Sequence, residues 1–161
     1  MAISNYSELQ TFVAQWAHRS DLTSVMPDLI KIGESYLNRV VRTRAQDTVT
    51  DLTASTSSRE LAFPSRMLEL CDLALVIDGR QEKLQQVGTE SFLAMIREEY
   101  GRPYAYAVRD KIEFDCIPDS AYTVKCHYFK SLDIATDTTN FLLTNYPDAY
   151  LFATMAALQS Y

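Results

Sequence analysis

The sequence predicts an α+β fold with a mainly helical core, built from the two ends of the chain, and an antiparallel β-sheet lobe inserted between them. Apolar residues recur at helical spacing over residues 7–44, alternate as in strands over residues 46–136, and return to a helical apolar stretch over residues 140–161. We therefore expect one domain over residues 1–161, with its helical core at 7–44 and 140–161 and its β-rich insertion at 46–136.

Two helices are predicted near the N-terminus and one at the end of the chain. Ser7 and Gln10 fit a capping box, and the apolar residues that follow predict a first helix over residues 7–18. Pro27 suits the first turn of a second helix, which keeps its apolar period to about residue 44. The last helix begins around Pro147 and is apolar on nearly every side, so another part of the protein or a partner must cover it.

The middle of the chain has the alternating pattern of strands with one buried face. A Thr-rich stretch at 48–53, a turn at 54–58 and the alternating residues 59–63 predict a first hairpin. Asp78-Gly79 permits a type I′ turn into a polar strand, which we expect at a sheet edge. Thr89 then caps a short helix. Three further strands predict an antiparallel meander, and they are expected at residues 104–108, 112–116 and 122–128.

Composition excludes several classes of function. The chain has 15 Lys and Arg against 21 Asp and Glu, and this net charge of −6 has the wrong sign for gripping a phosphate backbone. The 4 glycines are too dispersed for a phosphate-binding loop, and Cys71, Cys116 and Cys126 form no close pair for a disulfide or a zinc site. No apolar stretch is long enough for a bilayer span, and no signal layout opens the chain. We expect no cofactor, no metal and no membrane contact, and we expect that the protein is not exported.

Several short motifs follow one another in a characteristic order along nearly the whole chain. They are YSEL at 6–9, HRSDL at 18–22, LNR at 37–39, LAFP at 61–64, GRP at 101–103, PDSAY at 118–122 and NYPD at 145–148. Each motif consists mostly of cap, turn and core positions, so the resemblance rests on the order of the motifs and not on any single one. This order resembles the head-to-tail adaptors, also called tail accessory factors, of short-tailed and related bacteriophages and of prophages.

The resemblance implies a structural virion protein without enzymatic activity, made in the host cytoplasm and located in the neck between the capsid portal and the tail. Its partners would be the portal protein, downstream tail or nozzle proteins, and further copies of itself in a ring, commonly of about twelve. Such a ring extends the DNA channel. Its acidic subunits would let packaged DNA pass without specific binding. Chains of this kind usually continue into a C-terminal extension that grips the portal, whereas this sequence stops at Ser160-Tyr161.

Candidate interface residues are cations and large aromatic residues. They are Trp16, Arg39, Arg42, Arg44, Tyr104 and Tyr106. The arginines are expected at the end of the second helix, where they could pair with acidic groups on a neighbour or touch passing DNA. Cations that complement the dipole of a helix C-terminus are the favoured interpretation. The aromatic residues suit an interaction hot spot, although Trp16 equally fits the core stripe of its helix.

Two alternatives come from other classes of protein. A phage cell-wall hydrolase would need two carboxylates facing each other across a cleft, but the adjacent Glu98 and Glu99 point in different directions if they lie on a helix. His18 and His127 have no partner at metal-ligand spacing, and no serine lies in a nucleophile elbow. We therefore expect no catalytic residues. The other alternative is a small soluble binding module.

Overall fold

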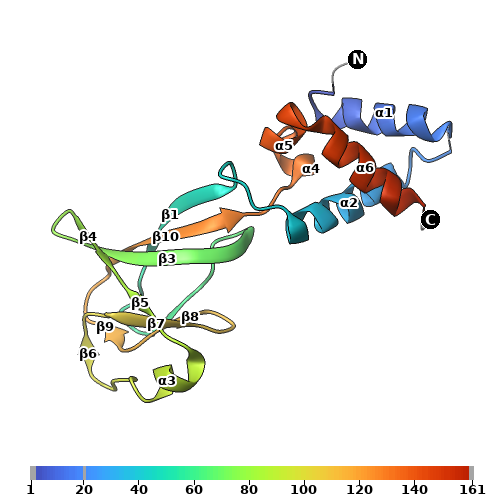
Figure 1. Ribbon diagram of the computed structural model, residues 1–161. Helices are drawn as coiled ribbons and strands as arrows, with labels where there is room; N and C mark the ends of the chain where they lie inside the picture. Colours follow the sequence, from blue (N-terminus) through green and yellow to red (C-terminus); the bar gives the residue numbers. More distant parts are fainter. Residues whose placement is uncertain (1–2, 20, 160–161) are drawn as a thin grey trace. The chain divides into compact units, whose positions relative to one another are not determined.

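A computed structural model describes residues 3–19 and 21–159 of the chain (Figure 1). The chain forms two compact units. The helical unit consists of Met1–Gln46 and Ser131–Tyr161, and the β unit consists of Asp47–Lys130. The predicted α+β class is confirmed.

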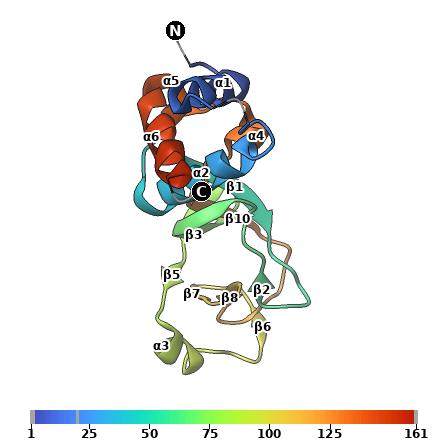
Figure 2. The same ribbon diagram turned by 90° about the vertical axis from the view of Figure 1, so that its right-hand side faces the viewer.

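The helical unit brings the two ends of the chain together around one core. Its helices are α1 (Tyr6–Ala17), α2 (Met26–Val40), α4 (Ile134–Asp137), α5 (Phe141–Asn145) and α6 (Pro147–Leu158). Figure 2 shows these helices around a common centre, which apolar side chains from α1, α2, α5 and α6 fill. The largest fully buried ones include Leu9, Ile30, Leu143 and Tyr150. Ser160 and Tyr161, to which the helical core is predicted to extend, lie outside the described part of the chain.

Three details of the helical prediction need correction. The side chain that caps α1 is Asn5, whose carbonyl oxygen accepts from the Glu8 backbone N–H, rather than Ser7. Helix α2 ends at Val40 and not at residue 44, because Val41 already has an extended backbone. The chain also becomes helical again at α4, inside the segment predicted as β-rich to residue 136.

Helices α2 and α6 cross at very short range because α2 carries a glycine at the contact. A Cβ atom added to Gly33 would lie 2.8 Å from the Ala153 carbonyl carbon and 2.9 Å from the Thr154 nitrogen. Real Cβ atoms do not approach backbone atoms this closely, so no side chain fits between the two helices here. The next residue of α2, Glu34, continues the contact.

A buried hydrogen-bond network joins α2 to the C-terminal segment. The Tyr150 hydroxyl donates to Glu34 Oε1 at 2.8 Å and accepts from Asn140 Nδ2 at 2.7 Å. Glu34 Oε1 also accepts from the Ile134 backbone N–H, which lies at the start of α4. Asn38 makes a reciprocal pair of bonds with the Leu132 backbone. These bonds satisfy polar groups that burial would otherwise leave unpaired.

The β unit contains two four-stranded sheets that share one core, and two short strands form a separate pair. Its elements are β1 (Asp47–Thr53), β2 (Glu60–Leu61), β3 (Met67–Ile77), β4 (Arg80–Lys83), β5 (Gln85–Gln86), α3 (Thr89–Leu93), β6 (Tyr100–Gly101), β7 (Ala105–Val108), β8 (Ile112–Phe114), β9 (Ile117–Pro118) and β10 (Thr123–Lys130). The larger sheet has the order β1-β10-β3-β4 (Figure 1), and the second has the order β2-β8-β7-β5 (Figure 2). Leu73, Leu75 and Val124 of the larger sheet belong to the same core as Ile112 and Phe114 of the second.

The turn at Asp78-Gly79 confirms the predicted hairpin between β3 and β4. Asp78 has φ 50° and Gly79 has φ 76°, as a type I′ turn requires, and β4 is an edge strand. Thr89, by contrast, is the first residue of α3, and no side chain caps that helix. The predicted cap is therefore wrong.

The other predicted strand pairings were only partly right. β1 pairs with β10 and β2 pairs with β8, so the predicted hairpin between residues 48–53 and 59–63 does not form. Within the predicted meander, β7 and β8 do pair, but β10 leaves this sheet and lies between β1 and β3. The correct partners are far apart in sequence, where local alternation gives no information.

We predict that Gly33→Ala destabilises the helical unit. Helix propensity alone would favour alanine by about 1 kcal/mol. The added Cβ meets backbone atoms that cannot rotate away, so we expect a net loss of about 1–3 kcal/mol. Urea unfolding followed by fluorescence of Trp16, the single tryptophan, measures it. Ser35→Ala, at an exposed position of the same helix, is the control and should change stability by no more than about 0.5 kcal/mol. A stabilised Gly33→Ala variant would contradict the close crossing.

We predict that Tyr150 makes the helical unit less stable at high pH. Burial, and then the nearby Glu34 carboxylate, raise the pKa of Tyr150 in the folded protein. Above about pH 10 the unfolded chain therefore loses this proton while the folded chain keeps it. The stabilisation is complete below that pH and falls by up to about 1.4 kcal/mol per pH unit above it.

Tyr150→Phe tests this prediction because it removes the ionisable group. Near neutral pH the variant should be less stable by about 1–3 kcal/mol, since Glu34 and Asn140 each lose a hydrogen-bond partner. The difference between wild type and variant should shrink between about pH 9 and about pH 11. A stability difference between wild type and variant that stays constant over this pH range would contradict the role of Tyr150.

Candidate protein-docking surface

A row of large apolar side chains on α2 lies open to solvent. Ile32, Tyr36 and Val40 follow one another at four-residue intervals, and their exposed fractions are 57%, 54% and 58%. This interval places them on one face of the helix, beside the stripe that packs into the core. Scattered exposed apolar residues are normal, but a continuous row is characteristic of a binding surface.

Helix α6 supplies the other side of the same surface. Phe152 is 59% exposed, and its ring meets that of Trp16 edge to face at 6.4 Å. Between α2 and α6 lies a groove of about 490 Å³, which small residues of α6 line together with Gly33. The absence of bulky side chains at the crossing thus creates both the close helix contact and the groove.

We call Trp16, Ile32, Tyr36, Arg39 and Phe152 the docking surface. Arg39 lies at the rim of the groove with its guanidinium 5.9 Å from the centre of the Tyr36 ring. Such an arrangement combines a cation, aromatic rings and an apolar groove, the residue types that are enriched at protein interfaces. It contains no nucleophile or general base, so it is suited to binding and not to catalysis.

The structure separates the arginines that the sequence placed at the end of the second helix. Arg39 belongs to α2 and to the docking surface. Arg42 follows the helix, and its guanidinium donates to the carbonyl oxygens of Asn38 and Val41 at 2.7 and 2.8 Å. It therefore complements the helix C-terminus, which was the favoured interpretation. Arg44 is exposed after the helix, so the prediction that Arg42 and Arg44 end the helix is wrong.

The two candidate tyrosines of the β unit have different environments. Tyr106 is 1% exposed in the core, and burial raises its pKa to about 12, so its side chain is not on the surface of this unit. Tyr104 is 47% exposed, and its ring lies 4.7 Å from the Arg97 guanidinium. Trp16 and Arg39 are therefore the only sequence candidates that the described residues bring to the docking surface.

Sequence reasoning missed Ile32, Tyr36 and Phe152. The signal was present, because α2 carries more apolar positions than one core stripe needs and α6 is apolar on nearly every side. Periodicity alone does not say which of two adjacent apolar stripes faces inward. For each helix, only the position of the helix that packs against it decides that.

The most deeply buried carboxylate of the β unit is structural. Asp115 is fully buried, and its Oδ1 accepts from the backbone N–H groups of Tyr104 and Ala105 at 3.0 and 3.1 Å. Its Oδ2 accepts from Arg97 Nε at 2.9 Å, and this bond raises the pKa of Arg97. Both oxygens are thus already bonded, so the carboxylate fixes the loop before β7 instead of offering a reactive group.

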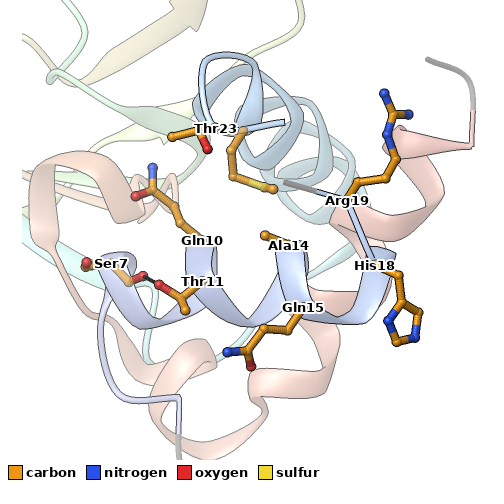
Figure 3. Close-up of a pocket in the computed structure, with 9 residues that line it drawn as sticks. Ser7, Gln10, Thr11, Ala14, Gln15, His18, Arg19 and Thr23 are labelled. Atoms are coloured by element: carbon orange, nitrogen blue, oxygen red, sulfur yellow. Dashed lines mark hydrogen bonds between the residues drawn. The ribbon is translucent and has the colours of Figure 1, made fainter. Parts of the chain in front are cut away.

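A second pocket lies beside α1 and the turn into α2 (Figure 3). Ser7, Gln10, Thr11, Ala14, Gln15, His18, Arg19, Thr23 and Met26 line it. Gln10 and Ala14 lie on the side of α1 toward Thr23, whereas Gln15 and His18 point the other way (Figure 3). The lining combines amide, hydroxyl and apolar groups without a convergent pair of ionisable groups, so it has no arrangement for acid–base chemistry.

The residues considered for catalysis or metal binding are not assembled into a site. Glu98 and Glu99 are exposed in a bend after α3 and not on a helix, and neither lies in an apolar pocket. His127 pairs with Asp47 on the sheet surface, and His18 is exposed at the end of α1. Over residues 3–19 and 21–159, no group of His, Cys, Asp and Glu could hold a metal ion, and no helix is long and apolar enough to cross a membrane.

Comparison with known proteins adds one positive finding. A family model described as SU10 adaptor protein matches residues 4–161. No curated protein matches the chain. The match covers both compact units, so the family assignment concerns the fold as a whole.

Proposed function

Because the chain belongs to the SU10 adaptor protein family, we propose that it forms a ring beneath the portal of a tailed bacteriophage. The family is a structural one and not an enzyme family, and it implies contacts with other head and tail proteins of the virion. In our proposal the ring lies in the neck, extends the DNA channel, and gives tail or nozzle proteins a platform. The chain then acts through geometry and affinity, without turnover.

The docking surface is the observation that best supports this function. A chain working alone would keep Trp16, Ile32, Tyr36 and Phe152 in contact with water, and the unfavourable free energy of this contact grows with the apolar area exposed. Covering them with a partner recovers that energy. We assign this surface to the portal, and we assign the loops of the β unit to proteins that join later. The rim position of Arg39 favours a portal segment that presents an acidic group next to apolar side chains.

The negative net charge of the chain suits the wall of a channel through which DNA must pass without being retained. With a net charge of −6 per copy, a ring accumulates negative charge, and DNA phosphates release no counterions against such a wall. We therefore propose that packaged DNA passes without specific binding. Passage of DNA along a mainly basic inner wall would contradict this part of the proposal.

Electron microscopy of the protein mixed with portal rings tests the assignment. We expect a layer of added density below the portal, and its absence would contradict the proposed function. Phe152→Ser should weaken portal binding by about 30-fold, the effect of removing an interface hot spot. Leu93→Ser is the control and should bind normally, because Leu93 is 57% exposed, close to the 59% of Phe152, but lies in the β unit. Equal portal binding by the two variants would show that the docking surface is not part of the interface with the portal.

A further inference from the structure

The larger sheet of the β unit has two open edges. Among the described residues, β1 and β4 each pair with one neighbouring strand, β10 and β3 respectively (Figure 1). β1 pairs with β10 over seven consecutive residues without a register shift, and it contains neither proline nor lysine. Proteins usually protect edge strands with bulges, prolines or lysines, because an open edge can pair with another strand. β1 lacks all three forms of protection.

The direction of the strands matches the two edges to each other. All neighbours in the order β1-β10-β3-β4 are antiparallel, so β1 and β4 run in opposite directions. If a second copy stands beside the first in the same orientation, its β4 therefore meets β1 as an antiparallel partner. The alternation of strand direction then continues from one copy to the next.

The residue register also matches. Asp51 pairs with Lys125, Lys125 with Ala74, and Ala74 with Lys83, so Asp51 and Lys83 lie on one row across the sheet and on one face. β4 thus lies level with the C-terminal half of β1. If the rows continue between copies, Lys83 of one copy stands directly opposite Asp51 of the next. Opposite charges at this position stabilise a strand pair.

We propose that β4 of one copy pairs with β1 of the next, so that the larger sheets join the copies of the ring. This inference rests on the proposed function and names the contact that holds the ring together. Asp51 and Lys83 already form ion pairs within the chain, with Lys125 at 2.8 Å and Asp72 at 3.1 Å, but their side chains are 57% and 71% exposed. The new contact would place Lys83, Asp51 and Lys125 on one row, and Asp72, two residues along β3 from that row, would extend the alternation of charge.

The contact is heterologous, which is what a ring needs. Each copy offers β1 on one side and β4 on the other, so every copy can accept one neighbour and be accepted by another. Pairing of β1 with β1 would instead produce a closed dimer. On the rows that both strands reach, Lys83 of β4 and Asp51 of β1 carry opposite charges, which favours the pairing of β4 with β1.

Disulfide trapping distinguishes these arrangements. We expect Asp51→Cys and Lys83→Cys in one chain to yield a ladder of covalent oligomers on mild oxidation. A mixture of the two single variants should yield cross-linked dimers, whereas neither single variant should exceed wild type, whose Cys116 and Cys126 are buried and Cys71 half-buried. Dimers formed by Asp51→Cys alone would indicate pairing of β1 with β1 and would overturn the proposal.

Charge reversal provides a second test that needs no cysteine. Asp51→Lys should weaken self-association in sedimentation by about tenfold, and Lys83→Asp in the same chain should restore it. Asp47→Lys is the matched control, because Asp47 lies on the same strand and face but opposite Phe129, on a row that β4 does not reach. Circular dichroism checks that all variants are folded. An equal effect of Asp47→Lys and Asp51→Lys, or no rescue by Lys83→Asp, would overturn the pairing.

The outcomes also separate this inference from the proposed function. If the chain forms no assembly, alone or on portal rings, both proposals fail. If a ring of density appears below the portal but neither the trapped ladder nor the charge rescue is observed, the ring stands and the contact between β1 and β4 is wrong.

Discussion

The close crossing of α2 and α6 is the contact on which the helical unit depends. Gly33 lets the two backbones meet at a distance that excludes any side chain, and beside it the Tyr150 hydroxyl bonds to Glu34. The crossing joins residues more than one hundred positions apart, so it also brings the two ends of the chain into one core. Without it the residues that form the docking surface would not lie together.

The same crossing explains why a binding surface exists there. Small residues on α6 let the helices approach, and this leaves a shallow groove flanked by the apolar side chains that neither helix buries. The buried polar network behind the groove holds both helices in place. A groove held in place in this way loses little conformational entropy when a partner binds, which suits a member of a structural adaptor family.

The β unit contributes a different kind of surface. Its core is closed between two sheets, but the outer strands of the larger sheet, β1 and β4, each pair with only one strand among the residues that the structure describes. The helical unit therefore offers a partner apolar side chains to pack against, whereas the β unit offers backbone groups for hydrogen bonding. Both fit a family of proteins that contact other components of the phage particle.

The sequence alone determined what depends on neighbouring residues. Helical period predicted α1, α2 and α6, and the positive φ angles that Asp78-Gly79 allows predicted one hairpin correctly. The pairing of β1 with β10, the end of α2 and the burial of Tyr106 beside the exposed Tyr104 were decided only by the tertiary structure. The physical reason is that periodicity defines an apolar face but not the distant segment that covers it, and a strand or helix receives its partner only when the chain folds.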